Sequence, residues 1–307
     1  MKKHSQRTRT EHFISQPSSQ FRQGAFDTNY PPPREDPFDS VCPAKGTRIS
    51  TALLLAAGTG TRLQPLTQDA PKCLTEIGGI SILERLITNL RAQGFKRLVV
   101  VIGHLGDQIR EFLQQHAGDM RIDYVINPDY RTTNNLYSLW LAREQIHEPF
   151  LLVESDLVFE TRMLDDMLYP DTMAVSRILP WMNGTTVELD SEQRVTAFHI
   201  GEDKHTATRQ YKTVNIYSLS LTSWREIEAR LYRYVSERRL GEYYEAVFAE
   251  MVADSTLSFN TVLFEADQWY EIDTEEDLLA AEILLARSHS ITNCSPRVAE
   301  SDQLLPG

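Results

Sequence analysis

The chain has 307 residues, of which 41% are hydrophobic, and it carries a formal net charge of -12 from 43 acidic and 31 basic residues. Its length and apolar content are sufficient for a globular core. The acidic balance makes a nucleic-acid polymer an unfavourable partner. An anionic ligand must therefore be bound by a few local cations, by backbone N–H groups, or by a metal ion held on carboxylates.

The two ends of the chain differ in composition from the middle. Residues 1–47 are rich in Ser, Gln, Pro and Arg and lack hydrophobic periodicity, so they are predicted to be a disordered leader, and residues 289–307 a flexible tail. No apolar run has the length of a signal peptide or a membrane helix. The three cysteines form no C-x-x-C pair, which argues against a zinc site and favours a reducing cytoplasm. We expect one folded domain over residues 48–288.

The first part of this domain alternates short apolar runs with helical patterns. Nearly continuous apolar strands that alternate with helices indicate a parallel sheet covered on both faces. The fold class is therefore predicted to be α/β, with a mostly parallel sheet. Strands are predicted over 51–57, 97–103, 122–128 and 150–156, and helices over 81–94, 106–118 and 134–146.

The pattern changes after Met163, where strands follow one another without long helices between them. This change predicts mixed or antiparallel pairing in a small substrate lobe. Thr274 is a candidate N-cap for a last helix with an acidic first turn. The predicted strands of this part are 173–178, 185–190, 194–200, 212–220 and 257–265, and the predicted helices before the last are 223–239 and 243–253.

The segment LLLAAGTGTRLQPLTQDAPK, residues 53–72, follows the first predicted strand at the edge where open α/β sheets bind ligands. Gly58 and Gly60 allow backbone N–H groups to approach a phosphate, and Arg62 and Lys72 add two cations. The segment is neither a Walker A loop nor a G-x-G-x-x-G dinucleotide fingerprint. A tight turn with surface cations is the alternative for the glycines alone, and pyrophosphate is the expected ligand.

Two pairs of carboxylates follow predicted strands with the same two-residue spacing. Glu154 and Asp156 end the segment FLLVESD, and Glu271 and Asp273 lie in YEID. Residues two apart lie on the same face of a strand. Carboxylates from distant segments suit an octahedral Mg²⁺ that also binds waters and substrate phosphates. Solvated strand ends, or Asp273 as an N-cap, are the structural alternatives.

The run L-A-A-G-x-G-x-R-L, followed by P-L-T and then P-K, resembles the signature of nucleotidyltransferases that activate sugar phosphates and related phosphoesters. The resemblance extends over residues 51–285. It implies a Rossmann-like, GT-A-like fold and transfer of a nucleoside monophosphate from an NTP to a phosphorylated acceptor, with release of pyrophosphate. Cys73 departs from the proline or alanine that often follows the lysine in this family, and is predicted to be a packing residue.

The resemblance also implies roles for particular side chains. Lys72, Arg62 and Asp156 are expected to be catalytic. The metal ligands are expected to be Asp156, Asp273 and Glu271, with Mg²⁺ as the cofactor. The nucleotide-binding residues that it implies are Leu55, Ala56, Ala57, Gly58, Gly60, Thr61, Arg62, Lys72, Asn134 and Asn135.

The segment NPDYRTTNNLYSLWLA, residues 127–142, is similar to bacterial CTP:phosphocholine cytidylyltransferases and their phosphonate-activating relatives. This similarity implies CTP as the donor and phosphocholine, 2-aminoethylphosphonate or another small phosphorylated alcohol as the acceptor. Helix capping is the alternative for Asn134 and Asn135, and a surface lysine is the alternative for Lys212. The expected acceptor-binding residues are Ser138, Trp181, Lys212, Tyr243, Tyr244 and Glu271.

Two other functions agree with the same sequence features. One is a sugar-1-phosphate nucleotidyltransferase that uses UTP or dTTP. The other is a catalytically silent nucleotide-binding regulatory subunit, against which the presence of Arg62, Lys72, Asp156 and Asp273 argues. The expected partners are small-molecule substrates, with no nucleic acid and no membrane, and a homo-oligomer is compatible with the sequence.

Overall fold

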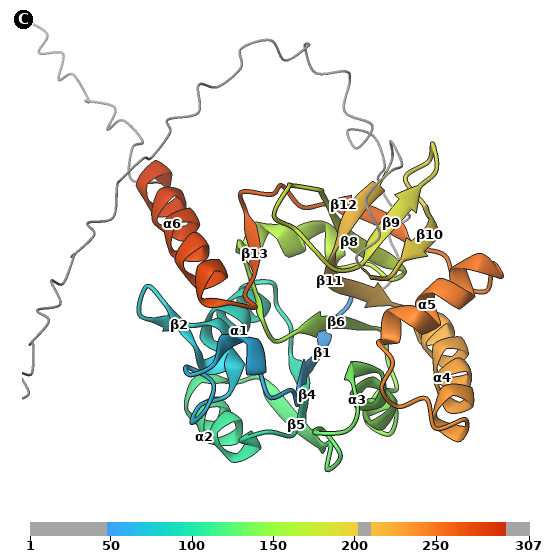
Figure 1. Cartoon of the computed structure of the whole chain (residues 1–307), viewed down its shortest axis with the longest axis horizontal. Coiled ribbons are helices and arrows are strands. Elements are labelled where there is room, and N and C mark those ends of the chain that lie inside the picture. Colours follow the sequence, from blue (N-terminus) through green and yellow to red (C-terminus); the bar gives the residue numbers. More distant parts are fainter. Residues whose placement is uncertain (1–47, 202–209, 293–307) are drawn as a thin grey trace, which may run out of the picture. The chain divides into compact units, whose positions relative to one another are not determined.

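A computed structural model of the protein describes residues 48–201 and 210–292, with side chains up to residue 285. The predicted leader lies outside the described residues. The part that is described contains a nine-stranded sheet in which seven strands follow the order β10-β9-β11-β6-β1-β4-β5 (Figure 1). The other two strands branch from this path, since β8 pairs with β11 and β12 pairs with β8.

Four neighbouring strands of this sheet are parallel, as predicted. β1 pairs with β4 and β6, and β4 pairs with β5. All six residues of β1 are buried, and each large apolar side chain buried there contributes roughly 1.5–3 kcal/mol. The apolar strands of the first half therefore form the centre of the domain. Their bounds are β1 Thr51–Ala56, β4 Arg97–Ile102, β5 Arg121–Ile126 and β6 Phe150–Glu154.

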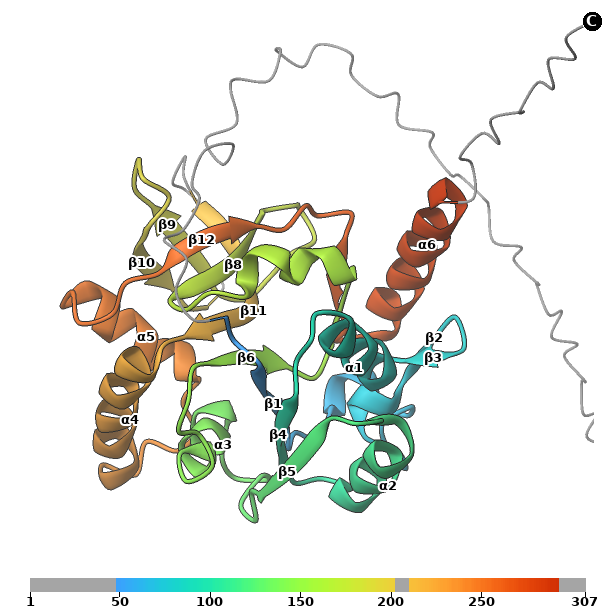
Figure 2. The same cartoon turned by 180° about the vertical axis from the view of Figure 1, so that it is seen from behind.

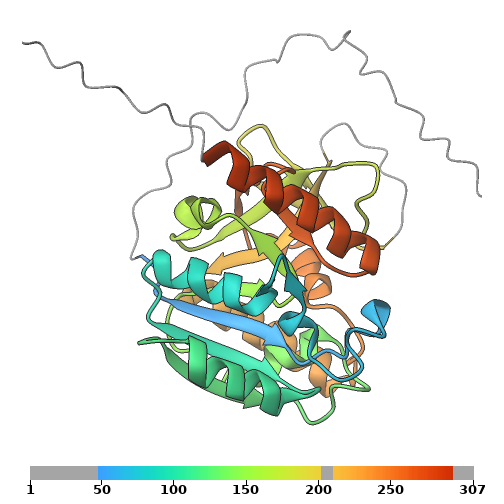
Figure 3. The same cartoon turned by 90° about the vertical axis from the view of Figure 1, so that its left-hand side faces the viewer.

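Helices cover both faces of the parallel strands. Because side chains alternate along a strand, Leu54 of β1 packs on one face with helices α1 and α2, while Leu53 and Leu55 pack on the other face with α3, α4 and α5. Figures 1 and 2 show the two groups of helices on opposite sides of the sheet, and Figure 3 shows α1 and α2 on their face of β1. The bounds are α1 Ile82–Ala92, α2 Gly106–His116, α3 Asn135–Ala142, α4 Leu221–Ser236 and α5 Tyr244–Ala253.

The second half of the sheet is mixed, which confirms the predicted change of pattern. β11 pairs antiparallel with β6, β8 and β9, β9 pairs antiparallel with β10, and β12 runs parallel to β8. A register shift in β11 lies between Thr213 and Tyr217. The bounds are β8 Thr172–Arg177, β9 Thr186–Leu189, β10 Val195–His199, β11 Gln210–Leu219 and β12 Asn260–Leu263.

Several short elements, of two to seven residues each, were not predicted because such short segments carry little periodicity. The most important of them is a two-stranded pairing between β7 and β13, in which Leu157 lies opposite Glu271. The Ile272 N–H also donates to the Asp156 carbonyl at 2.9 Å. This pairing brings the ESD and YEID segments together although they are far apart in sequence. These elements are β2 Glu76–Ile77, β3 Ile80–Ser81, β7 Leu157–Phe159, β13 Trp269–Glu271 and the 3-10 helices η1 Thr61–Leu63, η2 Lys72–Leu74 and η3 Thr161–Met167.

Two helices end at other residues than the sequence predicted. α3 ends at Ala142 rather than near residue 146, because i to i+3 bonds tighten the chain there: the Arg143 N–H donates to the Trp140 carbonyl at 3.3 Å. The last helix, α6 (Glu275–Thr292), continues past the predicted domain end at residue 288. Residues beyond 292 lie outside the description.

The predicted N-cap of α6 is confirmed. The Asp277 N–H donates to Thr274 Oγ1 at 3.2 Å, and the Thr274 N–H donates back to Asp277 Oδ2 at 2.8 Å. This is a capping box with aspartate as the acid. Asp277 Oδ2 also accepts from the Asp273 N–H at 3.0 Å. The cap therefore fixes the backbone of Asp273, so Asp273 is the residue before the N-cap and its carboxylate remains available for the site.

No helix among the described residues combines the length and the apolar character that a membrane span requires. Cys73 is buried in the core beside the α1 face, as predicted for a packing residue, and it is a free thiol. Burial raises the pKa of this thiol to about 12.

Candidate active site

The glycine loop, residues 57–60, leaves the buried end of β1 and enters the 3-10 helix η1. Gly60 has φ +60° and ψ +34°, which is the left-handed region that favours glycine. Its carbonyl accepts from Thr67 Oγ1 at 2.7 Å and from the Leu63 N–H at 3.0 Å. A Cβ on Gly60 would lie 3.1 Å from Lys72 Cβ. The loop therefore needs glycine here both for its backbone angles and for close contact with the lysine segment.

Replacement of Gly60 by alanine is expected to lower the free energy of unfolding by about 1–3 kcal/mol, because a side chain is strained at this φ and meets Thr67 and Lys72. Urea unfolding measures the change. Gly58→Ala is the matched control, since a Cβ there meets no atom within 4 Å, and its effect is expected to stay within about 0.5 kcal/mol. Equal stability of the two variants would contradict this account of the loop.

Lys72 joins the two predicted metal carboxylates. Its Nζ lies 2.8 Å from Asp156 Oδ2 and 2.7 Å from Asp273 Oδ1, and all three side chains are at most 15% exposed. Arg62 Nη2 lies 2.8 Å from the same oxygen of Asp273, with 66% of its side chain exposed. Burial alone would lower the pKa of Lys72, but the two carboxylates outweigh it and raise the pKa above its ordinary value. Lys72 is therefore an ammonium.

The carboxylate pair also has unused binding capacity. Asp156 Oδ1 is buried and has no hydrogen-bond partner within the described residues. Among those residues no group of three or more His, Cys, Asp or Glu side chains could hold a metal ion. Mg²⁺ is usually held by one or two carboxylates with waters and substrate phosphates, so the pair of Asp156 and Asp273, with one orphaned oxygen, fits this donor set.

Glu271 contacts Lys212 and Asn215 and does not share Lys72 with Asp156 and Asp273. Its Oε2 lies 3.2 Å from Lys212 Nζ, and its Oε1 accepts from Asn215 Nδ2 at 3.4 Å. The register shift in β11 places Asn215 at φ +61°, and Thr213 Oγ1 donates to Asn215 Oδ1 at 2.9 Å. The irregularity in β11 thus directs an amide into the site. Lys212 is 3% exposed, which excludes the surface-lysine alternative.

Two further carboxylates are buried near this group. Glu154 Oε1 accepts from Asn135 Nδ2 at 3.0 Å, and Asn135 Oδ1 accepts from the Tyr244 N–H at the start of α5. Burial raises the pKa of Glu154, and the neighbouring Asp156 and Glu245 raise it further. Glu245 is 5% exposed, and its Oε2 has no hydrogen-bond partner within the described residues. Burial raises the pKa of Glu245 to about 7.

The raised pKa of Glu245 predicts a pH-dependent stability. Its folded-state pKa of about 7 lies above the ordinary value of 4.5, so the folded state binds more protons and stability falls as pH rises between these values. Glu245→Gln is expected to stabilise the ligand-free protein by about 3 kcal/mol at pH 8 and by about 1 kcal/mol at pH 5. Urea unfolding at both pH values tests this. A gain that is independent of pH would contradict it, and Glu242→Gln, at an exposed position beside Arg239, is the control.

These side chains surround two connected cavities. The glycine-loop cavity, of about 230 Å³, is lined by the glycine loop, the start of α3 and the end of β6. The acidic cavity, of about 360 Å³, shares Arg62, Asn135, Glu154 and Tyr243 with it and extends toward β9 and β11. The charged residues that line the acidic cavity are Arg62, Glu154, Lys212, Glu245, Glu271 and Asp273.

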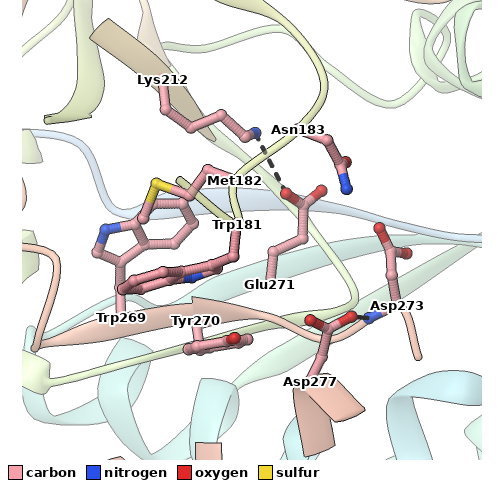
Figure 4. A pocket seen from close by; sticks show the side chains of 9 residues that line it. All are labelled: Trp181, Met182, Asn183, Lys212, Trp269, Tyr270, Glu271, Asp273 and Asp277. Carbon is pink, nitrogen blue, oxygen red and sulfur yellow. Dashed lines mark hydrogen bonds and ion pairs between the residues drawn. The ribbon is translucent and has the colours of Figure 1, made fainter. Parts of the chain in front are cut away.

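A third, smaller space of about 40 Å³ adjoins the acidic cavity and shares Asn183, Lys212, Glu271 and Asp273 with it. Figure 4 shows the side chains of Trp181, Met182 and Trp269 together at one end of it, with Lys212 extending toward Glu271. We call it the tryptophan cavity.

Comparison with known proteins agrees with this geometry. Residues 52–171 match the MobA-like NTP transferase domain. A CMP-5'-(3-aminopropyl)phosphonate synthase of Streptomyces rubellomurinus is 33% identical over 74% of this chain and 37% of its own length. A choline-phosphate cytidylyltransferase of Streptococcus pneumoniae is 29% identical over 41% of this chain and 53% of its own length.

Residues 52–171 belong to the MobA-like NTP transferase family.

The solved structure of the CTP:phosphocholine cytidylyltransferase from Streptococcus pneumoniae has the same fold as this NTP transferase domain. It has a TM-score of 0.67 and 22% sequence identity, and the match covers 78% of this chain and all of that one. The predicted Rossmann-like nucleotidyltransferase fold is confirmed. The chain spans about half or less of the length of the two curated relatives.

Most of the predicted nucleotide-binding side chains lie together in this NTP transferase domain. Asn134 is the N-cap of α3, since its Oδ1 accepts from the Asn135 N–H at 2.8 Å. Asn135 is not a second cap but joins Glu154 to α5. The predicted residues that line the glycine-loop cavity are Leu55, Ala57, Gly58, Arg62, Asn134 and Asn135, and those that do not line it are Ala56, Gly60, Thr61 and Lys72.

The predicted acceptor-binding residues are divided among different places. Lys212, Tyr243 and Glu271 line the acidic cavity. Ser138 lies in the glycine-loop cavity, where its Oγ accepts from Asn127 Nδ2 at 3.0 Å. Tyr244 faces the core: it is fully buried and its ring lies edge-on to Tyr217. Trp181 is 57% exposed and lines the tryptophan cavity.

Glu245 is a site residue that the sequence reasoning missed. The helical spacing of α5 could have identified it. Glu245 lies three residues before Phe248 and seven before Val252, so all three side chains are on the same buried side of the helix. A carboxylate on the apolar face of a predicted helix is unusual enough to indicate a site.

Proposed function

We propose that the protein transfers CMP from CTP to a small phosphorylated or phosphonate acceptor, with Mg²⁺ as cofactor, and releases pyrophosphate. The observation that carries this proposal is the position of Lys72, which bridges Asp156 and Asp273 beside the glycine loop. A cation and two carboxylates at the carboxyl edge of a parallel sheet suit a triphosphate and its metal ion. The names of the relatives favour a cytidine nucleotide and an aminoalkyl phosphonate or phosphocholine acceptor.

In the proposed reaction an acceptor oxygen attacks the α-phosphorus of CTP, and the bond from that phosphorus to the bridging oxygen of pyrophosphate breaks. Lys72 stabilises the negative charge that develops on the reacting phosphate, and exposed Arg62 contacts the leaving pyrophosphate. Phosphomonoesters are mostly ionised at neutral pH, so no general base is needed. Mg²⁺ held by Asp156 and Asp273 would neutralise charge on the nucleotide phosphates.

Substrate phosphates must compete with the existing ion pairs of the cations. Lys72 and Arg62 both contact Asp273 Oδ1, so a nucleotide with its metal ion can replace the carboxylate at one cation without leaving a charge unpaired. The exposed Arg62 side chain is the easier of the two to redirect. We assign the glycine-loop cavity to the nucleoside and the acidic cavity to the acceptor. We place the reaction in the cytoplasm, where nucleoside triphosphates are available.

A pyrophosphate-release screen tests the proposal. Purified protein is incubated with each of the four ribonucleoside triphosphates and with dTTP, against 2-aminoethylphosphonate, phosphocholine, inositol phosphate and hexose 1-phosphates. Release that requires both CTP and a phosphonate or phosphocholine acceptor is the expected result. Preference for UTP or dTTP with a sugar phosphate would establish the sugar nucleotidyltransferase instead, and no release with any pair would favour a silent nucleotide-binding subunit.

A further inference from the structure

The acidic cavity contains more buried carboxyl groups than the described residues pair with cations. Of its four carboxylates, Asp273 pairs with Arg62 at 2.8 Å and Glu271 pairs with Lys212 at 3.2 Å. Glu154 accepts one hydrogen bond from a neutral amide. Within residues 48–201 and 210–285 no ion pair reaches Glu154 or Glu245. The cavity thus presents two carboxylates without a cationic partner.

Glu245 is the more informative of the two. Its side chain is buried and lines the cavity, and its Oε2 has no hydrogen-bond partner among the described residues. The Asn135 side chain and a backbone N–H contribute hydrogen bonds to this carboxyl group, but a buried carboxylate oxygen that has no partner still destabilises the fold. Lys212 lowers the pKa of Glu245, yet burial dominates and the pKa is about 7. A cationic ligand group in the cavity would remove this cost.

The lining of the acidic cavity indicates what kind of cation it suits. Besides the charged groups it contains the amides of Asn135, Asn183 and Asn215, and Tyr243 is the aromatic residue among its described lining residues. Carboxylate and amide oxygens accept N–H donors, which a primary ammonium has and a trimethylammonium lacks. A quaternary ammonium is bound mainly by aromatic faces.

The tryptophan side chains that could bind a quaternary ammonium border a space that is too small for this bulky head group. Trp181 and Trp269 border the tryptophan cavity, whose volume is about 40 Å³ against about 360 Å³ for the acidic cavity (Figure 4). Trp269 is only 3% exposed and packs in the core. These two side chains therefore do not surround an open space of the size that a trimethylammonium needs.

We propose that the acceptor is a short zwitterion with a primary ammonium group, and that Glu245, with Glu154, binds this ammonium in the acidic cavity. The inference rests on the proposed function, because it names the class of acceptor for the same site. The anionic end of such an acceptor faces the Arg62 and Lys212 side of the cavity. Glu245 is then a residue that determines acceptor specificity.

The test compares acceptors and variants in the pyrophosphate-release assay. 2-Aminoethylphosphonate is compared with ethylphosphonate, which lacks the amine, and with phosphocholine. The wild-type protein is expected to prefer 2-aminoethylphosphonate over both others in kcat/KM. Glu245→Gln is expected to lower kcat/KM for 2-aminoethylphosphonate by about 30-fold more than for ethylphosphonate, mainly through KM, as loss of one partner of a buried charge pair requires.

Glu242→Gln is the matched control, since it makes the same chemical change three residues earlier on a side chain that is 45% exposed. An unchanged preference for the amine in Glu245→Gln overturns the inference. So does a wild-type preference for phosphocholine that is lost in Trp181→Ala. These outcomes leave CMP transfer intact, whereas absence of pyrophosphate release with every acceptor overturns the proposed function itself. Urea unfolding confirms that each variant is folded.

Discussion

Asp273→Asn is expected to reduce the rate of pyrophosphate release by roughly 10²–10³-fold, the loss typical when one preorganised electrostatic contact is removed from an active site. The substitution keeps the size of the side chain but removes its negative charge. Asp273 contacts both Lys72 and Arg62 and is one of the two carboxylates proposed to hold Mg²⁺. The measurement is kcat at saturating CTP and acceptor over a range of Mg²⁺ concentrations.

The control for this variant removes a negative charge from a nearby residue of the same segment that lies outside the site. Glu276→Gln changes an exposed side chain in the first turn of α6 and is expected to retain the wild-type rate within about twofold. Removal of divalent cations with EDTA is expected to abolish release by the wild-type protein. An Asp273→Asn variant with the wild-type rate and the same Mg²⁺ dependence would contradict the assignment of this carboxylate.

Lys72→Met is expected to reduce turnover by a similar factor, roughly 10²–10³-fold, and also to change how the protein responds to metal. Without the ammonium, Asp156 and Asp273 lie close together with only exposed Arg62 as a cationic partner. Breaking a buried ion pair in this way costs about 3 kcal/mol of stability. A divalent cation can then replace the ammonium between the two carboxylates.

The Tm of Lys72→Met is therefore expected to fall without metal and to rise on addition of MgCl₂ by more than the wild-type Tm rises. Differential scanning fluorimetry with and without MgCl₂ measures both shifts. Lys96→Met, at an exposed lysine, is the control and should behave as the wild type. Equal Mg²⁺ shifts in wild type and Lys72→Met would show that Lys72 and the metal ion do not share these carboxylates.

Much of the fold could be predicted from the sequence because its central strands are apolar on both faces. The run TALLLA is buried at every position, so it can be recognised as a buried strand without knowing which strands pair with it. The antiparallel half was also recognisable from strands that follow one another closely. β7 and β13 were not predictable, since each has three residues and their pairing depends on contacts between distant segments.

The candidate site was only partly predictable, for the same physical reason. The glycine loop and the two acidic segments are local patterns, whereas the roles of single residues depend on which way each side chain points. Tyr243 and Tyr244 are neighbours at the start of α5, yet the first is 51% exposed and the second is fully buried. The partner of Lys212 could not be inferred because Glu271 lies on another strand. Glu245 was overlooked because its importance comes from burial.

The most direct test of CMP transfer is ³¹P NMR of a reaction that contains the protein, CTP, MgCl₂ and 2-aminoethylphosphonate. The predicted result is a new pair of coupled phosphorus signals from a phosphonate joined to a phosphate, together with one equivalent of pyrophosphate, and loss of both in Asp273→Asn. Spectra in which CTP remains unchanged both with 2-aminoethylphosphonate and with phosphocholine, or in which CTP is hydrolysed without a new phosphorus–oxygen–phosphorus link, would contradict the proposed function.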